Sequence, residues 1–269
     1  MADGGEGTLD ALCDLVGYVD AVDAFDRPRR ARVGRRRDAT IVEAAEVIPL
    51  DPERLDVDAA SSRGFGELLR QLRPERLVVS LGGTATMDAG AGLLEVLDAL
   101  PAPTTVLCDV RTTLYDAPRL FGPQKGATSE QVAALEGRFR ALAALAPFAT
   151  VPGSGAAGGL GAALASLGAE LVPGAPAVLD LVGLDPARYD LVVTGEGRVD
   201  ETTPEGKAPA EVARRCAAAG VECVVFGGIV EEPLEGVETV ALSGDPSRAA
   251  DDLLELGHRL GRRLLGSAH

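Results

Sequence analysis

The chain has 269 residues, a net charge of −15 at pH 7 and a 46% share of hydrophobic residues. This length suits one large domain or two small ones, and the apolar share excludes a disordered chain because it suffices for a sizeable core. The acidic balance argues against binding to nucleic acid or to anionic membranes. A site for phosphates or carboxylates must therefore supply local positive charge or oriented backbone N–H groups.

Cysteines and histidines are too sparse for most metal or disulfide frameworks. The four cysteines, Cys13, Cys108, Cys216 and Cys223, show no C-x-x-C spacing. We expect them to be free thiols in a reducing cytoplasm. His258 and His269 are the only histidines, which argues against a Ser-His-Asp triad. The first residues are acidic and polar, and no apolar run approaches the roughly 18 residues that span a bilayer. We therefore expect a cytoplasmic protein without a membrane partner.

The first third of the chain predicts a turn, two helices and short strands. In chain order we expect a glycine-rich turn at 3–8, a helix to about residue 17, short strands within 18–48 and a helix over 63–71. The run 27–37 is the only dense basic patch, and a solvated strand or hairpin face is its favoured interpretation.

From residue 76 onward, strand and helix signals alternate. Strands are predicted at 76–81, 104–108, 189–194, 221–226 and 237–242, and helices at 89–100, 129–145, 209–219 and 247–265. This alternation indicates an α/β fold with mostly parallel strands. Nearly every predicted strand ends in glycine plus an acidic or hydroxyl residue. Because ligands bind beyond the carboxyl ends of parallel strands, the site is expected there.

Two glycine-rich segments are candidates for phosphate binding. Segment 82–92 follows a strand and precedes a helix, where glycines and helix N–H groups can approach an anion. Within it, Asp88 could hold Mg²⁺ or cap the helix, and a tight turn between strand and helix is an equal alternative. It matches neither a Walker A loop nor G-x-G-x-x-G. Segment 153–161 could serve as a nucleotide cradle or simply allow close backbone packing.

The two lysines are informative because the chain has 24 arginines. Lys125 and Lys207 both stand beside glycines in predicted loops. Lysine differs from arginine as a compact point charge that can approach a phosphate end-on.

Acidic residues gather near Lys207 and near the amino terminus. Glu196, Arg198 and Asp200 follow a predicted strand, with Lys207 close behind. Carboxylates and a cation beside a turn fit the handling of a metal-bound phosphate. The alternative is a solvated loop with a local salt bridge. Residues 3–7 hold a similar group of acids and glycines.

Taken together, these segments resemble the glycerate kinase family of the bacterial D-glycerate 2-kinase type. The similarity lies in six motifs. In the first half of the chain they are residues 2–8 (A-D-G-G-E-G-T), residues 81–92, and residues 108–109 together with 121–127 (F-G-P-Q-K-G-A). In the second half they are residues 155–161 (G-A-A-G-G-L-G), 194–200 (T-G-E-G-R-V-D) and 206–209 (G-K-A-P). The motifs occur in the family's order, from residue 2 to about residue 230.

The resemblance implies two α/β lobes with mostly parallel sheets and an active-site cleft between them. It places residues 1–50 with 190–269 in a discontinuous terminal lobe and 51–189 in a middle lobe. It also implies phosphorylation of D-glycerate to 2-phosphoglycerate with Mg²⁺ and ATP. The alternatives are a homologue that has lost catalysis and a kinase of another small hydroxy acid.

The resemblance also assigns site residues. The residues expected in the cleft for catalysis are Asp3, Asp88, Glu196, Asp200 and Lys207, with Glu6 beside them. Those expected to bind ATP are Gly82, Gly83, Thr84, Lys125, Gly155, Gly158, Gly159, Gly195 and Arg198. The expected magnesium ligands are Asp88 and Glu196.

The sequence departs from the family in three places. The family opens with a strand and an A-P-D-S-F-K-G motif, which do not precede the first motif here. We therefore expect a natural start upstream of Met1, which could represent a misread GTG or TTG codon. The segment between Leu100 and Thr104 is short, and Met87 and Ala89 replace the usual Asn and Gly.

Overall fold

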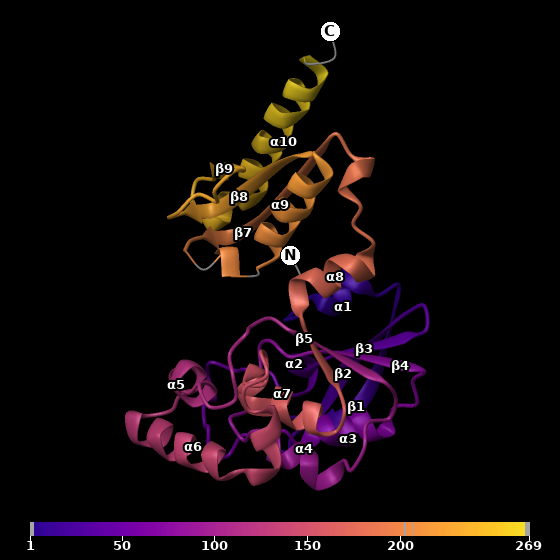
Figure 1. Ribbon diagram of the computed structural model, residues 1–269, viewed down its shortest axis with the longest axis vertical. Helices are drawn as coiled ribbons and strands as arrows, with labels where there is room; N and C mark the ends of the chain where they lie inside the picture. Colours follow the sequence, from indigo (N-terminus) through magenta and orange to yellow (C-terminus); the bar gives the residue numbers. More distant parts are fainter. Residues whose placement is uncertain (1–2, 202, 206, 267–269) are drawn as a thin grey trace. The chain divides into compact units, whose positions relative to one another are not determined.

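The computed structural model describes residues 3–201, 203–205 and 207–266, so Ala2 and Gly206 of the motifs lie outside the described residues. The chain divides into two compact units, Ala2–Gly183 and Leu184–His269, each with its own sheet (Figure 1). This division differs from the discontinuous lobe expected at residues 1–50. The strands within residues 15–43 pair into the same sheet as those that follow, so they belong to the first unit.

The first unit is built on a six-stranded sheet in sequential order. Its strands are β1 (Leu15–Val22), β2 (Pro28–Arg36), β3 (Ala39–Glu43), β4 (Arg76–Ser80), β5 (Thr104–Cys108) and β6 (Glu170–Pro173). The first three strands pair antiparallel, whereas β3 to β6 pair parallel. The carboxyl ends of β3, β4 and β5 therefore meet at one edge of the sheet.

Helices cover both faces of this sheet. Helices α1 (Thr8–Leu12) and α8 (Gly174–Val182) lie on one face, and α3 (Arg63–Gln71), α4 (Ala91–Val96) and α7 (Ala156–Ser166) on the other (Figure 1). The core alternates with the strand period: Ile41, Val78 and Leu107 pack with α1 and α8, and their neighbours Val42, Val79 and Val106 pack on the opposite face. Burial on both faces explains why these strands are continuous apolar runs.

Shorter helices complete the first unit. They are α2 (Ala44–Val47), α5 (Ala117–Phe121), η1 (Pro123–Lys125), α6 (Ser129–Ala141) and η2 (Ala143–Phe148). The amino-terminal cap of α6 is Thr128, which forms a reciprocal capping box with Gln131.

Two further helices are shorter than expected. Helix α1 ends at Leu12 because the chain enters β1 at Leu15. Helix α4 begins at Ala91 instead of Ala89, since Ala89 and Gly90 have left-handed backbone angles, φ 53° and 74°. These angles are incompatible with a right-handed helix.

The second unit is a parallel three-stranded sheet with helices. Its elements are η3 (Pro186–Arg188), β7 (Leu191–Val199), η4 (Thr203–Glu205), α9 (Ala208–Ala219), β8 (Glu222–Val230), β9 (Glu238–Ala241), η5 (Pro246–Arg248) and α10 (Ala249–Gly266). Val224 packs against Leu256 and Leu260 of α10. Strand β7 continues past Thr194, where the sequence suggested an end, because Gly195 lets its backbone stay close to Phe226 on β8.

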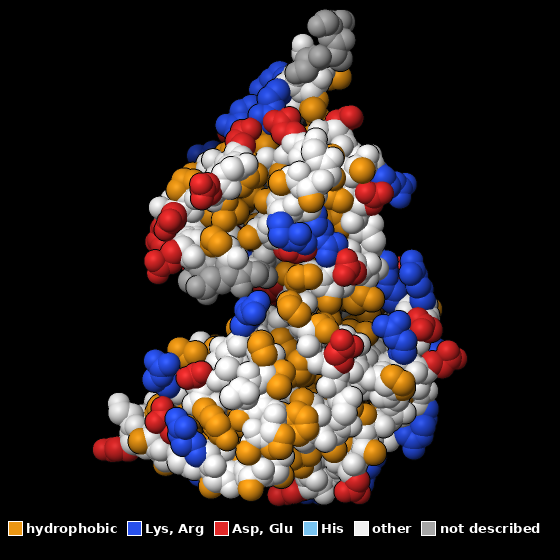
Figure 2. Space-filling view, in the orientation of Figure 1, with side chains coloured by type: hydrophobic (Ala, Val, Ile, Leu, Met, Phe, Trp, Pro, Cys, Tyr) orange, Lys and Arg blue, Asp and Glu red, His pale blue; other side chains and the backbone are white. Residues whose placement is uncertain are grey.

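Within the described part of the chain, no helix combines the length and apolarity needed to cross a bilayer. On the face seen in Figure 2, acidic and basic side chains are interspersed with apolar atoms, and no continuous apolar belt is visible there.

Candidate active site

The amino-terminal turn lies at the carboxyl edge of β4 and β5. The carbonyl oxygen of Gly4 accepts a hydrogen bond of 3.2 Å from the backbone N–H of Leu81, directly after β4. Gly4 has φ +101°, and a Cβ there would lie 2.9 Å from the Cα of Gly174. A side chain at this position would therefore collide with backbone. The turn places Asp3 and Glu6 at the carboxyl edge of β4 and β5.

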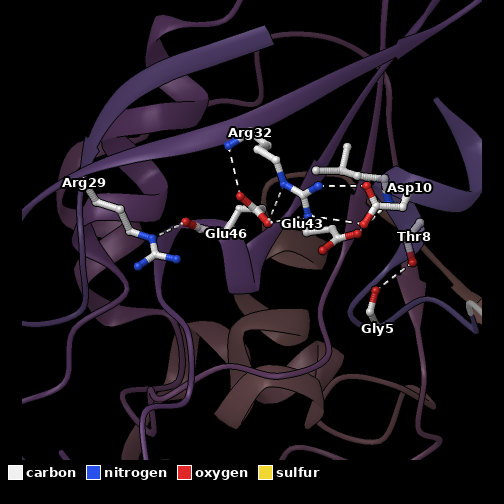
Figure 3. Close-up of polar contacts among 8 residues, drawn as sticks. Gly5, Thr8, Asp10, Arg29, Arg32, Glu43 and Glu46 are labelled. Atoms are coloured by element: carbon white, nitrogen blue, oxygen red, sulfur yellow. Dashed lines mark hydrogen bonds and ion pairs between the residues drawn. The ribbon is translucent and has the colours of Figure 1, made fainter. Parts of the chain in front are cut away.

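Glu43, the last residue of β3, anchors this turn (Figure 3). Its side chain is buried, and Oε1 accepts a hydrogen bond of 2.5 Å from the backbone N–H of Leu9. Burial raises the pKa of Glu43, and hydrogen bonds from Leu9 and Gly7 partly oppose that rise. The hydroxyl of Thr8 donates to the carbonyl oxygen of Gly5 at 2.7 Å. The amino-terminal turn is thus fixed by a side chain of β3 and by a hydrogen bond within the turn.

The arginine-rich run forms β2 and its flanks. Arg32 lies between two carboxylates, at 2.7 Å from Asp10 and 2.9 Å from Glu46, and Arg29 donates to the carbonyl oxygen of Glu46 (Figure 3). These ion pairs favour the interpretation of a hairpin face, and they occupy positive charge that an anion would need.

Glycines after β4 let the amino-terminal turn approach closely. A Cβ at Gly82 would lie 2.6 Å from the Cα of Gly5 and 2.8 Å from Oδ2 of Asp109. Gly83 has φ +73°, and a Cβ there would lie 2.7 Å from Cγ of Glu6. Glycine at 82 and 83 is therefore required by neighbours from other motifs.

Lys125 lies in a small pocket beside these glycines. The pocket is lined in part by Gly82, Gly83, Thr84, Asp109 and Lys125. Its volume of about 70 Å³ is below the roughly 300–1,000 Å³ of sites that enclose drug-sized ligands, so it fits one small group. Lys125 is only 4% exposed, and its Nζ donates to the carbonyl oxygen of Thr86 at 2.9 Å.

The surroundings of this pocket shift the pKa of Lys125. Burial lowers the pKa of Lys125 to about 8, with Asp88 and Asp109 opposing the change. The hydroxyl of Thr84 is buried and, among the described residues, has no hydrogen-bond partner. A buried cation and an unpaired hydroxyl in one pocket suit an anionic ligand.

Asp109, the first residue after β5, is the site residue that sequence reasoning left without a role. Its side chain is exposed at the pocket, whereas neighbouring protein atoms partly desolvate the carboxylate and raise its pKa to about 6. The neighbouring Asp3 adds to the rise, and Lys125 opposes it. Its position directly after a parallel strand was the signal that could have identified it.

Asp88 is engaged by four donors. Its carboxylate accepts from the backbone and hydroxyl of Ser62, both at 2.8 Å, from Gly90 N at 3.0 Å and from Gly92 N at 3.2 Å. These contacts join the start of α3 to the start of α4, which supports the helix-capping alternative for Asp88.

The second glycine-rich segment packs against the first. Gly158 and Gly159 have φ +66° and +94°, and the carbonyl oxygen of Gly158 accepts from Ala89 N at 3.0 Å. A Cβ at Gly159 would lie 2.8 Å from the Cα of Ala89, and one at Gly155 would lie 2.8 Å from the carbonyl carbon of Thr113. Close backbone packing, the second alternative, accounts for glycine at these three positions.

In the second unit, Lys207 lies between two carboxylates. Its Nζ is 3.6 Å from Oε2 of Glu196 and 3.5 Å from Oδ1 of Asp200. Thr203 donates to Oε1 of Glu196 at 2.8 Å and accepts from Asp200 N at 3.1 Å, which fixes the cluster. Lys207 also occupies the N-cap position of α9, without a side-chain cap hydrogen bond, and the dipole of this helix favours a nearby anion. The structure thus brings together three of the predicted residues.

Two other predicted residues of this unit contact groups outside that cluster. Arg198 forms an ion pair with Glu231, at an exposed position on β7. Gly195 lies against the ring of Phe226, where a Cβ would come within 2.5 Å of it. Among the described residues, no group of three or more His, Cys, Asp or Glu side chains that could hold a metal ion is found.

Comparisons with known proteins agree with the motifs. The model of the glycerate kinase family matches residues 1–102 and 99–245. The Escherichia coli K12 protein named glycerate 2-kinase is 32% identical, with 79% of this chain and 71% of the relative covered. The Bacillus subtilis 168 protein named glycerate kinase is 30% identical, with 88% of this chain and 77% of the relative covered.

A solved structure has the same fold. It is described as glycerate kinase 2 of Salmonella typhimurium LT2 and superposes with a TM-score of 0.73 at 29% identity, covering 89% of this chain and 79% of that one. The chain therefore belongs to the glycerate kinase family and is a kinase.

Proposed function

We propose that this chain transfers the terminal phosphoryl group of ATP to the 2-hydroxyl group of D-glycerate, giving 2-phosphoglycerate. The relatives named glycerate kinase, and the one named glycerate 2-kinase, support this substrate and this hydroxyl. The observation that carries the proposal is the placement of the lysines. A chain with only two lysines sets both of them among carboxylates, one beside the glycine turn after β4 and one at the start of α9.

Phosphoryl transfer depends mainly on positioning and on neutralising charge. The side chain of Lys207 is 34% exposed, so its ammonium group can contact a phosphate oxygen while it stays close to Glu196 and Asp200. The positive end of the α9 helix dipole lies at the amino terminus of the helix, beside Lys207, and also favours an anion. We propose that Lys207 and the first turn of α9 bind the phosphates of the nucleotide.

Mg²⁺ commonly takes one or two carboxylates and fills its other positions with water and phosphate oxygens. Glu196 and Asp200 fit this requirement, since each side chain is 20% exposed and presents hard oxygen atoms beside Lys207. Asp88 fits it less well, because four donors already contact its carboxylate. When bound, the ion would neutralise charge on the phosphates.

The pocket beside Lys125 suits a small anionic group. Lys125 supplies a buried charge and Thr84 an unpaired hydroxyl, while Gly82 and Gly83 expose backbone. A carboxylate or a phosphoryl group matches both the charge and the volume. We propose that this pocket holds the anionic end of a substrate next to the reacting atoms.

The proposal is tested with the 269-residue chain. ADP release is followed with Mg²⁺, ATP and D-glycerate, and ³¹P NMR identifies the product. We expect 2-phosphoglycerate. A 3-phosphoglycerate product would overturn the position of transfer. Faster release with L-glycerate, glycolate or lactate would establish another hydroxy acid as substrate. Binding of D-glycerate by calorimetry without ADP release would establish a homologue that has lost catalysis.

A further inference from the structure

The carboxylates at the carboxyl edge of the first sheet differ in what already contacts them. Four donors engage Asp88, and Glu43 holds the backbone of Leu9. Asp3 accepts from Gly5 N at 3.3 Å. These three carboxylates therefore have structural contacts that a change of protonation or position would disturb.

Asp109 differs from them. Within the part of the chain that the structure describes, the only hydrogen bond to its carboxylate comes from its own backbone N–H. It lines the same pocket as Gly82 and Lys125. It thus offers an oxygen atom that can accept a proton without breaking a contact between elements.

The surroundings of Asp109 suit a base that works near neutral pH. The charged groups that influence it are Asp3 from the amino-terminal turn and Lys125 from η1. Asp109 in turn raises the pKa of the adjacent Cys108 thiol. Asp3 and desolvation disfavour its anion, while Lys125 favours it, so that its pKa lies at about 6. The group is then mostly ionised at pH 7 and more basic than an ordinary aspartate, as efficient proton transfer requires.

We propose that Asp109 is the general base of the reaction and accepts the proton of the substrate hydroxyl that attacks phosphorus. This inference rests on the function proposed above. The hydroxyl O–H bond breaks and its proton passes to a carboxylate oxygen of Asp109. The hydroxyl oxygen forms the new O–P bond, and the P–O bond to ADP breaks, with ADP leaving as the anion that retains the electron pair. Asp109 later releases the proton to solvent.

The first experiment compares wild type, Asp109→Asn and a control, Asp98→Asn, in steady-state ADP release over pH 5 to 9. Asp98 is an exposed aspartate after α4, outside the pocket. Asparagine keeps the shape of Asp109 but cannot accept the proton. We expect kcat to fall by at least about 100-fold in Asp109→Asn, with KM for the hydroxy acid changed by less than about threefold. Wild type and Asp98→Asn should lose kcat below a pH of about 6, and this acidic limb should vanish in Asp109→Asn.

The second experiment uses Asp109→Ala with added formate, a small carboxylate that can enter the vacated space. We expect formate to restore turnover in this variant and to leave wild type unchanged, which a structural role would not produce. Thermal melting of each variant verifies folding. Because the raised pKa shows that the Asp109 anion is disfavoured in the folded chain, both variants should melt no lower than wild type at pH 7.5.

The outcomes separate this inference from the function on which it rests. Absence of wild-type turnover would refute the proposed function, and the role of Asp109 with it. An active wild type with Asp109→Asn within about threefold of its kcat would refute the role of Asp109 alone. So would a folded Asp109→Ala that shows no response to formate while wild type is active.

Discussion

Replacing Gly158 by alanine should destabilise the first unit through two separable effects. With φ +66°, the residue sits in the left-handed region, which costs a non-glycine residue roughly 1–2 kcal/mol. The added methyl group would also lie 2.8 Å from the carbonyl carbon of Thr86 and overlap its oxygen. Since this neighbour is backbone, relief requires a shift that typically costs about 1–3 kcal/mol. The sum is roughly 2–5 kcal/mol.

Gly168→Ala is the matched control. Gly168 belongs to the same unit, has φ +95°, and has no neighbouring atom within 4 Å of an added Cβ, so it should show only the backbone cost. Thermal unfolding measures the difference. At about 2–4 °C per kcal/mol, Gly158→Ala should melt roughly 2–12 °C below the control. Because the carbonyl of Thr86 also accepts the hydrogen bond of Lys125, turnover should fall only in Gly158→Ala. Equal melting temperatures for the two variants would refute the packing argument.

Three further predictions follow from charged side chains. Lys207→Ala should lower kcat at least about tenfold, or about 1.4 kcal/mol in the barrier, and unchanged steady-state kinetics would remove Lys207 from the mechanism. Burial lowers the pKa of Lys125 from 10.5 to about 8, so between these values this side chain binds more protons in the unfolded chain, and its contribution to the unfolding free energy should rise with pH. The cysteines, whose pKa values burial raises, contribute the opposite trend above about pH 9. Urea titrations should therefore show a more positive slope in wild type than in Lys125→Met, and equal slopes would contradict the prediction. Glu43→Ala should reduce the unfolding free energy by about 1–3 kcal/mol, since it leaves the N–H of Leu9 without its acceptor. Glu43→Gln should lose less, and a larger loss in chemical denaturation would argue against the hydrogen bond as the cause.

Much of the fold could be predicted because its signals are local. The apolar runs that predicted β4 and β5 and the helical pattern over 209–219 each depend on residues within one element, and the structure confirms these strands and α9. Element ends were harder to predict where distant residues decide them. Strand β7 continues through Gly195 because β8 pairs with it, and α4 starts late because Gly158 holds the backbone of Ala89.

The candidate site shows the same limit. The sequence indicated an acid next to Lys207, and the structure places Glu196 and Asp200 on either side of it. The environment of Asp109 could not be read from the sequence, because its pKa depends on Asp3, which is distant in the chain. Whether a carboxylate already accepts hydrogen bonds likewise depends on other segments of the chain, as Asp88 shows by accepting from Ser62.

The scarcity of lysine gives this chain a built-in chemical handle. Lys125 is 4% exposed and the Lys207 side chain 34%, so an amine-directed acylating reagent meets one accessible lysine side chain in the folded protein, besides the terminal amine. A protease that cuts after lysine has the same single accessible target, directly before α9. Labelling or cleavage at that position therefore reports occupancy of the Glu196 and Asp200 cluster directly, without a coupled enzyme assay and without introducing a foreign residue.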